Sequence, residues 1–315
     1  MMENKKIFIT GGAGFLGQNI IKRYYKKNEI TVYSRDEVKH YYLKNKFPKI
    51  KCVIGDVRNF DLMKRASKEH NIGIFAASLK QIGSVDQNYE EAKKIIIDGA
   101  INSRRCAEEN KMEAACFISS DKSRSATTLY GSMKFVAGEI FIVNSEQTNT
   151  RLSTAIYGNV TNSTGSIIPL IWDSIKNNYE LTLYSPNMTR FILNVEQAID
   201  VIECSLEYDG YNVIPNVNSF FIKDLFNIYK KEFGLKYVIG KPRISEKIHE
   251  IMISKEELPR TIYSKYSDIY LMHYKNVVDN KKLITHFKNN EYSSENLTLS
   301  YEQLKQILEK NNYYK

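Results

Sequence analysis

The feature that most constrains this chain is a glycine-rich turn between a strand and a helix near the N-terminus. Residues 6–10 (KIFIT) form a β-branched and aromatic run, and residues 11–17 (GGAGFLG) follow it at once. Apolar residues then recur on one helical face. A strand, a glycine turn and a helix in this order place a pyrophosphate at the N-terminus of the helix, so the sequence predicts a dinucleotide-binding fold.

The glycines of this turn have separate functions. We expect Gly11 to form the turn, Gly14 to let the backbone approach the phosphates, and Gly17 to let the helix pack closely on the strand. Phe15 and Leu16 lie between the last two glycines, and we expect all five residues to contact the cofactor.

Strand patterns continue to alternate with helical patterns along the first half of the chain. This alternation is typical of the α/β class and predicts a Rossmann-like doubly wound parallel sheet. It ends after Tyr157, so we predict a dinucleotide-binding domain at residues 1–160 and a smaller C-terminal substrate-binding region at residues 161–315, from which some segments return to the first domain. Ser300 and Gln303 form a capping box and predict a final helix. The further strands are expected at residues 29–34, 51–55, 72–77 and 114–119, and a long helix at residues 90–109.

The end of the second strand meets the adenosine ribose in folds of this kind. Ser34 and Arg35 suit a 2′-phosphate, whereas Asp36 suits a free 2′-hydroxyl, so the residues leave NADP and NAD open.

The next strands supply further cofactor contacts. Asp56, with Val57, follows the third strand where an adenine ring is usually held; alternatively, Asp56 caps the helix that begins near Asp61. Ala76 and Ala77 end the fourth strand with small side chains, which would let the backbone pass close to the cofactor.

The candidate catalytic residues follow the fifth strand. Asp121 and Lys122 end an apolar run, and Tyr130 and Lys134 are spaced to share one face of a helix. A cation about 5 Å from a phenol favours the phenolate by roughly 3 kcal/mol at an effective dielectric of 20. Lys134 together with an oxidised nicotinamide can therefore make Tyr130 a base; otherwise the two residues are an ordinary surface pair.

Charge and composition restrict the partners. The 315 residues include 45 lysines and arginines and 36 acidic residues, a formal net charge of +9. The positive charges are spread along the chain, which favours an anionic small molecule over nucleic acid. The four cysteines are scattered and the five histidines lack ligand spacing, so we expect a reduced, cytoplasmic protein without a metal site. No apolar run is long enough to cross a bilayer, so we expect no membrane insertion.

The order of motifs resembles that of extended short-chain dehydrogenase/reductases. More narrowly, it is similar to the soluble UDP-N-acetylglucosamine 4,6-dehydratases that invert C5, over roughly residues 5–310. Membrane-attached relatives usually carry methionine at the position of Tyr130. The motifs that carry the resemblance are TGGAGFLG, VYSRDE, IGDVRN, SSDK, YGSMK, YGNV, MTRF, EKIHEIMI and EYSS.

This resemblance implies a catalytic role for each candidate. Tyr130, assisted by Lys134, would remove the O4 proton, Lys122 would take the C5 hydrogen as a proton, and Asp121 would protonate the departing C6 hydroxyl. Ser120 would bind the substrate. The resemblance also favours NADP over NAD, since the Ser-Arg-Asp turn accompanies NADP in the family, and it implies a homo-oligomer.

The substrate implied by the resemblance is a UDP-sugar. Arg190 and Arg243 suit its diphosphate, because guanidinium groups bind phosphate oxygens in pairs, although most single arginines are simply solvated. We expect Lys80, Asn159 and Glu246 to complete the contacts to the substrate.

The chain departs from the family pattern at several positions, and two other functions stay open. These are an NAD-dependent UDP-sugar 4-epimerase, which needs Tyr130 and Lys134 but no Asp121-Lys122 pair, and a non-catalytic dinucleotide-binding protein. The departures are Ile96 for an asparagine, Ser125-Ala126 for Asn-Pro, Ile156 for an arginine, and Ile244-Ser245 for Pro-Gly.

Overall fold

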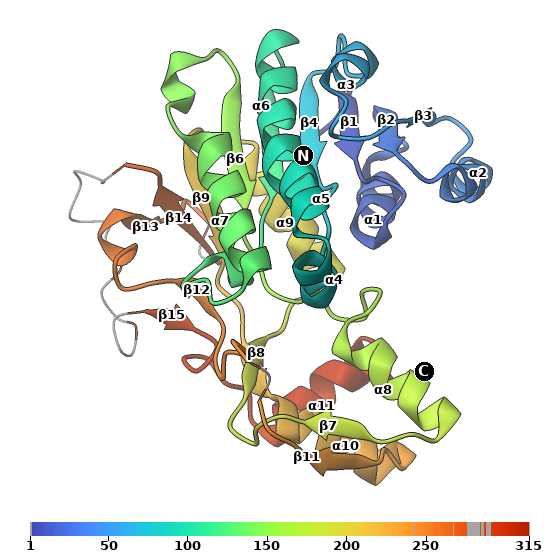
Figure 1. The fold of residues 1–315 in the computed structure, drawn as a ribbon, viewed down its shortest axis with the longest axis vertical. Helices are drawn as coiled ribbons and strands as arrows, with labels where there is room; N and C mark the ends of the chain where they lie inside the picture. The colour runs from blue at the N-terminus through green and yellow to red at the C-terminus, as the bar shows by residue number, and fades with distance from the viewer. Residues whose placement is uncertain are drawn as a thin grey trace.

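A nine-stranded sheet forms the centre of the molecule. The computed structural model describes residues 2–242, 244–266, 268–275, 284, 287 and 291–314. Within them the strand order is β13-β14-β9-β6-β5-β4-β1-β2-β3, parallel from β9 to β3, with β14 and β13 antiparallel at one edge (Figure 1). The strands are β1 (Lys6–Thr10), β2 (Glu29–Ser34), β3 (Lys51–Ile54), β4 (Ile72–Phe75), β5 (Ala114–Ile118), β6 (Arg151–Ala155), β9 (Tyr211–Pro215), β13 (Thr261–Tyr263) and β14 (Ile269–His273).

Helices cover both faces of this sheet, as the predicted Rossmann-like fold requires. Ile7 and Ile9 of β1 pack against α1 and α9 on one face, and Phe8 between them packs on the other face with α6 and α7. This alternation follows from the two-residue period of a strand, and the central strands are apolar on both sides because both faces are covered. The helices are α1 (Phe15–Tyr24), α2 (Glu37–Lys46), α3 (Phe60–Ala66), α4 (Ile82–Gln87), α5 (Tyr89–Lys93), α6 (Gly99–Glu109), α7 (Leu129–Ile142) and α9 (Val195–Ser205).

The long helix predicted at residues 90–109 is interrupted by a π-helical segment, η1 (Lys94–Asp98), between α5 and α6. Ile96, one of the departures from the family pattern, lies in this segment and is buried. Short 3-10 turns occur at η2 (Asp121–Ser123), η3 (Ser145–Gln147) and η4 (Leu258–Arg260).

A smaller body with its own apolar core lies at one end of the sheet, in the lower part of Figure 1. The last helix begins at the predicted capping box of Ser300 and Gln303. Strands β9, β14 and β13 follow residue 161 in sequence but belong to the large sheet. The smaller body contains α8 (Ile167–Asn177), β7 (Leu181–Leu183), β8 (Thr189–Phe191), β10 (Ser219–Phe221), α10 (Ile222–Phe233), β11 (Tyr237–Ile239) and α11 (Tyr301–Lys310), and a further pair, β12 (Ile251–Ile253) and β15 (Tyr292–Ser293), lies beside it.

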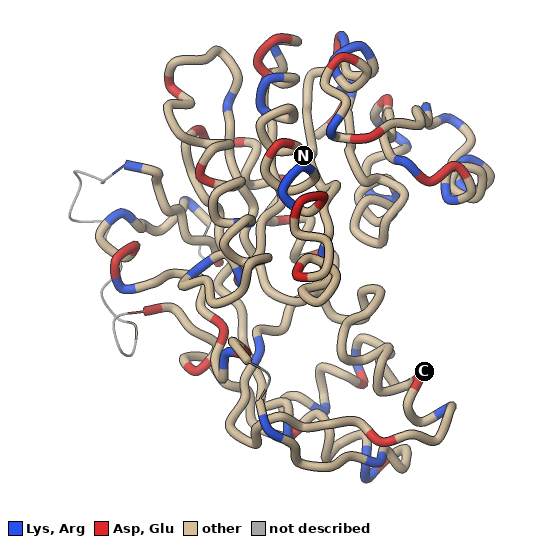
Figure 2. Tube along the Cα trace, viewed as in Figure 1, with Lys and Arg blue, Asp and Glu red and all other residues tan. Residues whose placement is uncertain are grey.

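Along the described part of the trace, positively and negatively charged residues are interspersed (Figure 2). This distribution agrees with the sequence, in which lysines are spread rather than clustered. In the part of the chain that the structure describes, no helix has both the length and the apolar character that crossing a bilayer requires.

Candidate active site

The glycine turn at residues 11–17 has the tight packing that a phosphate loop needs. Gly11 has a φ of +69°, and a Cβ there would lie 2.9 Å from the Ala77 nitrogen. A Cβ on Gly17 would lie 2.4 Å from the Gly12 Cα, so α1 packs directly on the turn. Gly14 precedes α1, whose first N–H groups have no side-chain cap. These groups are therefore free to bind an anion.

A cavity of about 810 Å³ lies over this turn, at the carboxyl ends of the parallel strands. Its size and its backbone-rich lining fit a dinucleotide. Every residue that the sequence predicts for the cofactor lines it: Gly11, Gly14, Phe15, Leu16, Gly17, Ser34, Arg35, Asp56, Val57, Ala76, Ala77, Tyr130 and Lys134.

Arg35 and Asp36, the two residues predicted for the ribose end, differ in how firmly their side chains are bound within the protein. The Asp36 carboxylate caps α2 by accepting a hydrogen bond from the Lys39 backbone N–H at 2.9 Å, and it also pairs with the Lys39 ammonium. Arg35 is more exposed, at 59%, and its guanidinium lies 3.6 Å from Asp56. Arg35 is thus the freer side chain at this end of the cavity.

Asp56 does not cap the helix that follows it, which was one of its two predicted roles. Asn59 caps α3 instead, by accepting from the Leu62 N–H at 3.0 Å. The Asp56 carboxylate accepts hydrogen bonds from the Arg58 backbone and guanidinium. The cap lies three residues further along because α3 begins at Phe60.

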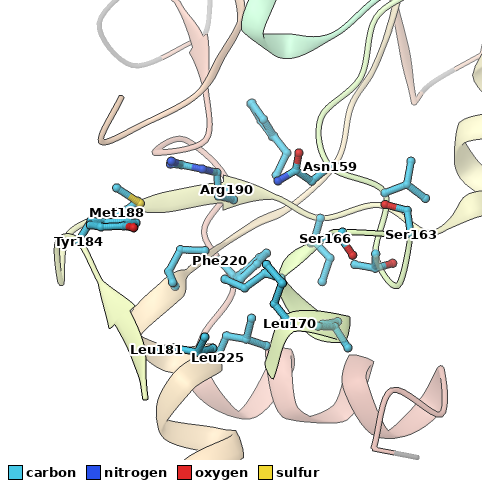
Figure 3. Close-up of a pocket in the computed structure, with 18 of the residues that line it drawn as sticks. Asn159, Ser163, Ser166, Leu170, Leu181, Tyr184, Met188, Arg190, Phe220 and Leu225 are labelled. Carbon is cyan, nitrogen blue, oxygen red and sulfur yellow. The ribbon is translucent and has the colours of Figure 1, made fainter. Parts of the chain in front are cut away.

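A second cavity, of about 610 Å³, lies between the large sheet and the smaller body. Leu170, Leu181 and Leu225 form an apolar side, while Arg190 and Asn159 lie at another edge (Figure 3). The two cavities share Lys80, Ser120, Tyr130 and Asn159, so a ligand in one can meet a ligand in the other there. The Lys80 ammonium donates to the Thr164 carbonyl and so connects two loops at this junction.

Tyr130 lies at the junction of the cavities, near the start of α7. Its burial raises the pKa of the phenol, while the Lys122 ammonium and a hydrogen bond with Ser120 act to lower it. Lys134 donates to the Ile118 carbonyl at 2.7 Å, and burial lowers the pKa of its ammonium to about 7. The predicted action of Lys134 on the phenol stays a prediction, and Lys122 is a further cation that favours the phenolate.

The Asp121-Lys122 pair is held by a short turn against α7. Ser120 Oγ donates to Asp121 Oδ1 at 2.9 Å, and the Lys122 ammonium lies 3.3 Å from the same oxygen. A Cβ on Gly131 would lie 2.2 Å from the Lys122 carbonyl oxygen, so only glycine fits after Tyr130. This close packing brings both halves of the predicted catalytic set to one place.

Lys122 also has a second carboxylate partner. Glu250 Oε1 lies 3.3 Å from the Lys122 ammonium. Burial opposes the charge of Lys122, but Asp121 and Glu250 outweigh this effect and raise the pKa of the ammonium. Asn159 lies close as well, 3.5 Å from the same nitrogen.

Arg190 is bound to the protein by several contacts. Its guanidinium donates to the Glu246 carboxylate at 2.5 Å and to the carbonyls of Thr189 and Ile248, and it lies 3.6 Å from Glu250. Most of its donors are therefore used within the protein, so its binding to a diphosphate stays a prediction. Arg243, the other arginine predicted for this role, lies outside the described residues. We call Asp121, Lys122, Arg190, Glu246 and Glu250 the charge cluster.

Residues 7–273 of the chain match the family described as polysaccharide biosynthesis protein. The chain belongs to this family. An uncharacterized membrane protein of Methanocaldococcus jannaschii is 32% identical to it, covering 99% of this chain and 97% of the relative. A UDP-N-acetylglucosamine 4,6-dehydratase (inverting) of Campylobacter jejuni is 32% identical, covering 82% and 80%. A UDP-glucose 4-epimerase of Rickettsia bellii is 31% identical, covering 82% and 81%.

Among solved structures, that of Pen from Bacillus thuringiensis matches 99% of each chain with a TM-score of 0.87 at 24% identity, which shows a shared fold. This polysaccharide biosynthesis protein is thus an extended short-chain dehydrogenase/reductase that resembles UDP-N-acetylglucosamine 4,6-dehydratase.

Two charged residues in this part of the structure were not predicted from the sequence. Glu250 lies in the charge cluster, and Arg124 is fully buried behind it, 2.6 Å from Glu257 and 3.2 Å from Glu139. Glu250 stands four residues after Glu246 in the EKIHEIMI motif, which was its only signal in the sequence.

Proposed function

We propose that the protein is an NADP-dependent UDP-N-acetylglucosamine 4,6-dehydratase that inverts C5. One observation carries this proposal: Tyr130 lies at the junction of a cavity suited to a dinucleotide and a second cavity large enough for a sugar nucleotide, and Lys122, which pairs with the buried Asp121, lines the second cavity. The similarity to the Campylobacter jejuni dehydratase supports it.

When bound, the nicotinamide would accept a hydride from C4 and later return it to C6. Tyr130 removes the O4 proton during the oxidation, which leaves a 4-ketone that acidifies the hydrogen on C5. Lys122 takes that proton, the C5–C6 double bond forms, and the C6–O bond breaks as Asp121 protonates the departing oxygen. Hydride returned to C6 would then give an enolate, and a solvent-derived proton added to C5 from the opposite face would complete the inversion.

Lys122 can act as this base only after it loses its own proton. Its ammonium is held in the charged form by two carboxylates, Asp121 Oδ1 and Glu250 Oε1, each 3.3 Å away. Either carboxylate is therefore near enough to receive the proton.

The cofactor proposed is NADP rather than NAD. Arg35 lines the ribose end of the cavity with a largely exposed guanidinium, and Lys39 adds a second positive charge there. Asp36 is used as a helix cap, so it is less available to a 2′-hydroxyl. A 2′-phosphate would form charge-assisted hydrogen bonds with Arg35.

The substrate contacts proposed are those of the second cavity. Lys80, Asn159, Arg190 and Glu246 line it, and Ser120 lies where the sugar would meet the cofactor. The UDP moiety would extend toward the smaller body, whose side of the cavity is largely apolar (Figure 3).

A UDP-sugar 4-epimerase is the second candidate, because the Rickettsia bellii relative carries that name. An epimerase needs Tyr130 and the cofactor but has no use for an acid and a base at C6 and C5. The buried Asp121-Lys122 pair, held by Ser120 and Glu250, therefore favours the dehydratase.

Two variants test the assignment. Lys122→Ala should block elimination but leave a slow, single-turnover oxidation at C4, visible as reduced nicotinamide absorbance. Tyr130→Phe should abolish that signal too, because no group is left to take the O4 proton. Full turnover of Lys122→Ala with a UDP-hexose epimer as product would favour the epimerase.

A further inference from the structure

Glu250 contacts Lys122 from the side away from the sugar. It precedes β12, is only 3% exposed, and lines a small cavity of about 210 Å³ together with Lys122. Among the described residues that line the sugar cavity, Lys122 is present and Glu250 is not. Glu250 therefore reaches the sugar cavity through the two lining residues that it contacts, Lys122 and Arg190, and Lys122 is the one with a proposed role as a base.

Asp121 and Glu250 compete for one ammonium. Both carboxylates approach Lys122 to 3.3 Å, but Glu250 has a second cation, Arg190, 3.6 Å from the same oxygen. Asp121 Oδ2 and Glu250 Oε2 are buried without a hydrogen-bond partner. Ionising both carboxylates in such a site is costly, so we expect one of them to hold a proton.

The surroundings decide which carboxylate holds that proton. Burial raises the pKa of Asp121, and the charge of Glu250 adds to this effect. For Glu250, burial acts in the same direction, but Lys122 and Arg190 outweigh it and lower the pKa of the carboxylate. The direction of these effects favours a proton on Asp121 and a negative charge on Glu250, beside the ammonium of Lys122. The charged and titratable groups that face this trio are Tyr130, Arg190 and Lys247.

We propose that Glu250 is a positioning residue that receives the proton of Lys122, so that Lys122 becomes the base at C5 while Asp121 keeps its proton for the C6 hydroxyl. This inference rests on the proposed dehydratase activity.

The protons balance over the elimination. Lys122 gives a proton to Glu250 and takes the one from C5, while Asp121 gives its proton to the departing oxygen, which leaves as water. The three groups then again hold two protons, on Lys122 and Glu250. Transfer from Glu250 through Lys122 to Asp121 restores the starting state.

Glu250→Gln removes the charge and keeps the size of the side chain, and the dependence of kcat on pH is the first readout. In the proposed active form of the wild type, Asp121, Lys122 and Glu250 together hold two protons. The fall of kcat at low pH therefore reports protonation of Glu250, and the fall at high pH reports loss of the proton from Asp121. In Glu250→Gln, Asp121 and Lys122 together hold one proton. The fall of kcat at low pH then reports Asp121, and the fall at high pH reports Lys122. Both limbs should therefore move to higher pH, by about one unit or more.

The reactivity of Lys122 is the second readout and needs no turnover. Competitive acetylation across a pH series, followed by mass spectrometry, measures where the amine becomes neutral. In Glu250→Gln, Lys122 should become reactive at a pH about one unit or more below that of the wild type, because a neighbouring negative charge is gone. Glu250→Asp, which keeps the carboxylate, should lie between the two.

Glu256→Gln is the matched control, because this nearby carboxylate is 67% exposed and pairs with Lys255. It should move neither readout. An equal loss of kcat at every pH in Glu250→Gln, with Lys122 labelling unchanged, would show a merely structural role and overturn the inference. If the wild type forms no dehydrated sugar, the proposed function is wrong. If the wild type is a dehydratase but Glu250→Gln leaves both limbs of the kcat–pH profile unchanged, the proposed function stands and only the inference about Glu250 is wrong.

Discussion

The glycine turn at residues 11–17 and the charge cluster adjoin the same pair of cavities but are built in opposite ways. The turn works through its backbone, and all its parts come from one short stretch of sequence. The charge cluster works through buried and half-buried side chains from three separate segments: the Asp121-Lys122 turn, strand β8 and the residues before β12. Local sequence patterns specify the first, whereas tertiary packing assembles the second.

The largest effect should come from removing Arg124, a second buried charged group that tertiary packing assembles. Arg124→Ala removes a fully buried cation from the buried Glu257 and the half-buried Glu139 and leaves them Arg260 as a cation; removing one partner of a buried ion pair costs about 3–5 kcal/mol. Urea unfolding measures this loss. Arg105→Ala, which breaks an exposed pair with Glu109, should cost under about 1 kcal/mol. Similar losses for both variants would contradict the view that burial by tertiary packing makes the Arg124 pair the stronger one.

The glycine turn should instead be sensitive to a single methyl group. Gly17→Ala places a Cβ 2.4 Å from backbone and should cost about 3 kcal/mol, because backbone cannot move aside as a side chain can. Gly14→Ala meets only the Gly11 carbonyl oxygen, at 3.3 Å, and should cost under about 1 kcal/mol while weakening cofactor binding. Thermal unfolding and a cofactor titration separate the two effects. Equal stability of both variants would be evidence against the packing argument.

The ribose end of the cofactor cavity tests how far a local motif predicts specificity. Arg35→Ala should weaken NADP binding by about tenfold and NAD binding far less, since only NADP loses a charge-assisted contact. Asp36→Ala is the control: it removes the cap of α2 and about 1 kcal/mol of stability but should leave the ratio of the two affinities unchanged. A wild-type preference for NAD in calorimetric titrations would refute the NADP assignment.

The smallest effect concerns a departure from the family pattern. Ser245 adopts a φ of +65° where the resemblance predicts glycine. Glycine has no Cβ penalty at this φ, although it gives the unfolded chain more freedom, so Ser245→Gly should stabilise the fold by about 0.5–1 kcal/mol. Scanning calorimetry should show a small rise in Tm. A fall would mean that the serine side chain contributes more than the strain costs.

Much of the fold could be predicted because its signals are local. The glycine turn, the five strands from Lys6 to Ile118 and the capping box at Ser300 were all found where the patterns placed them. The π-helical segment at Lys94–Asp98 was missed, since its apolar residues read as an ordinary helix.

The site was predictable only in part, for a physical reason. Tyr130, Asp121 and Lys122 meet because they flank one strand end, which sequence spacing shows. Glu250 reaches Lys122 only through tertiary packing, and no periodicity encodes such a contact. The same packing turned Arg190 toward Glu246, which spacing could not show.

Turnover of UDP-N-acetylglucosamine in D2O tests the central claim most directly. If Lys122 removes the C5 hydrogen, the product should have lost one water and carry deuterium at C5, while the hydrogen from C4 appears at C6. Mass spectrometry and proton NMR of the product give both results. A product that keeps its 6-hydroxyl, has no deuterium at C5 and has its hydrogen back on C4 would contradict the dehydratase assignment.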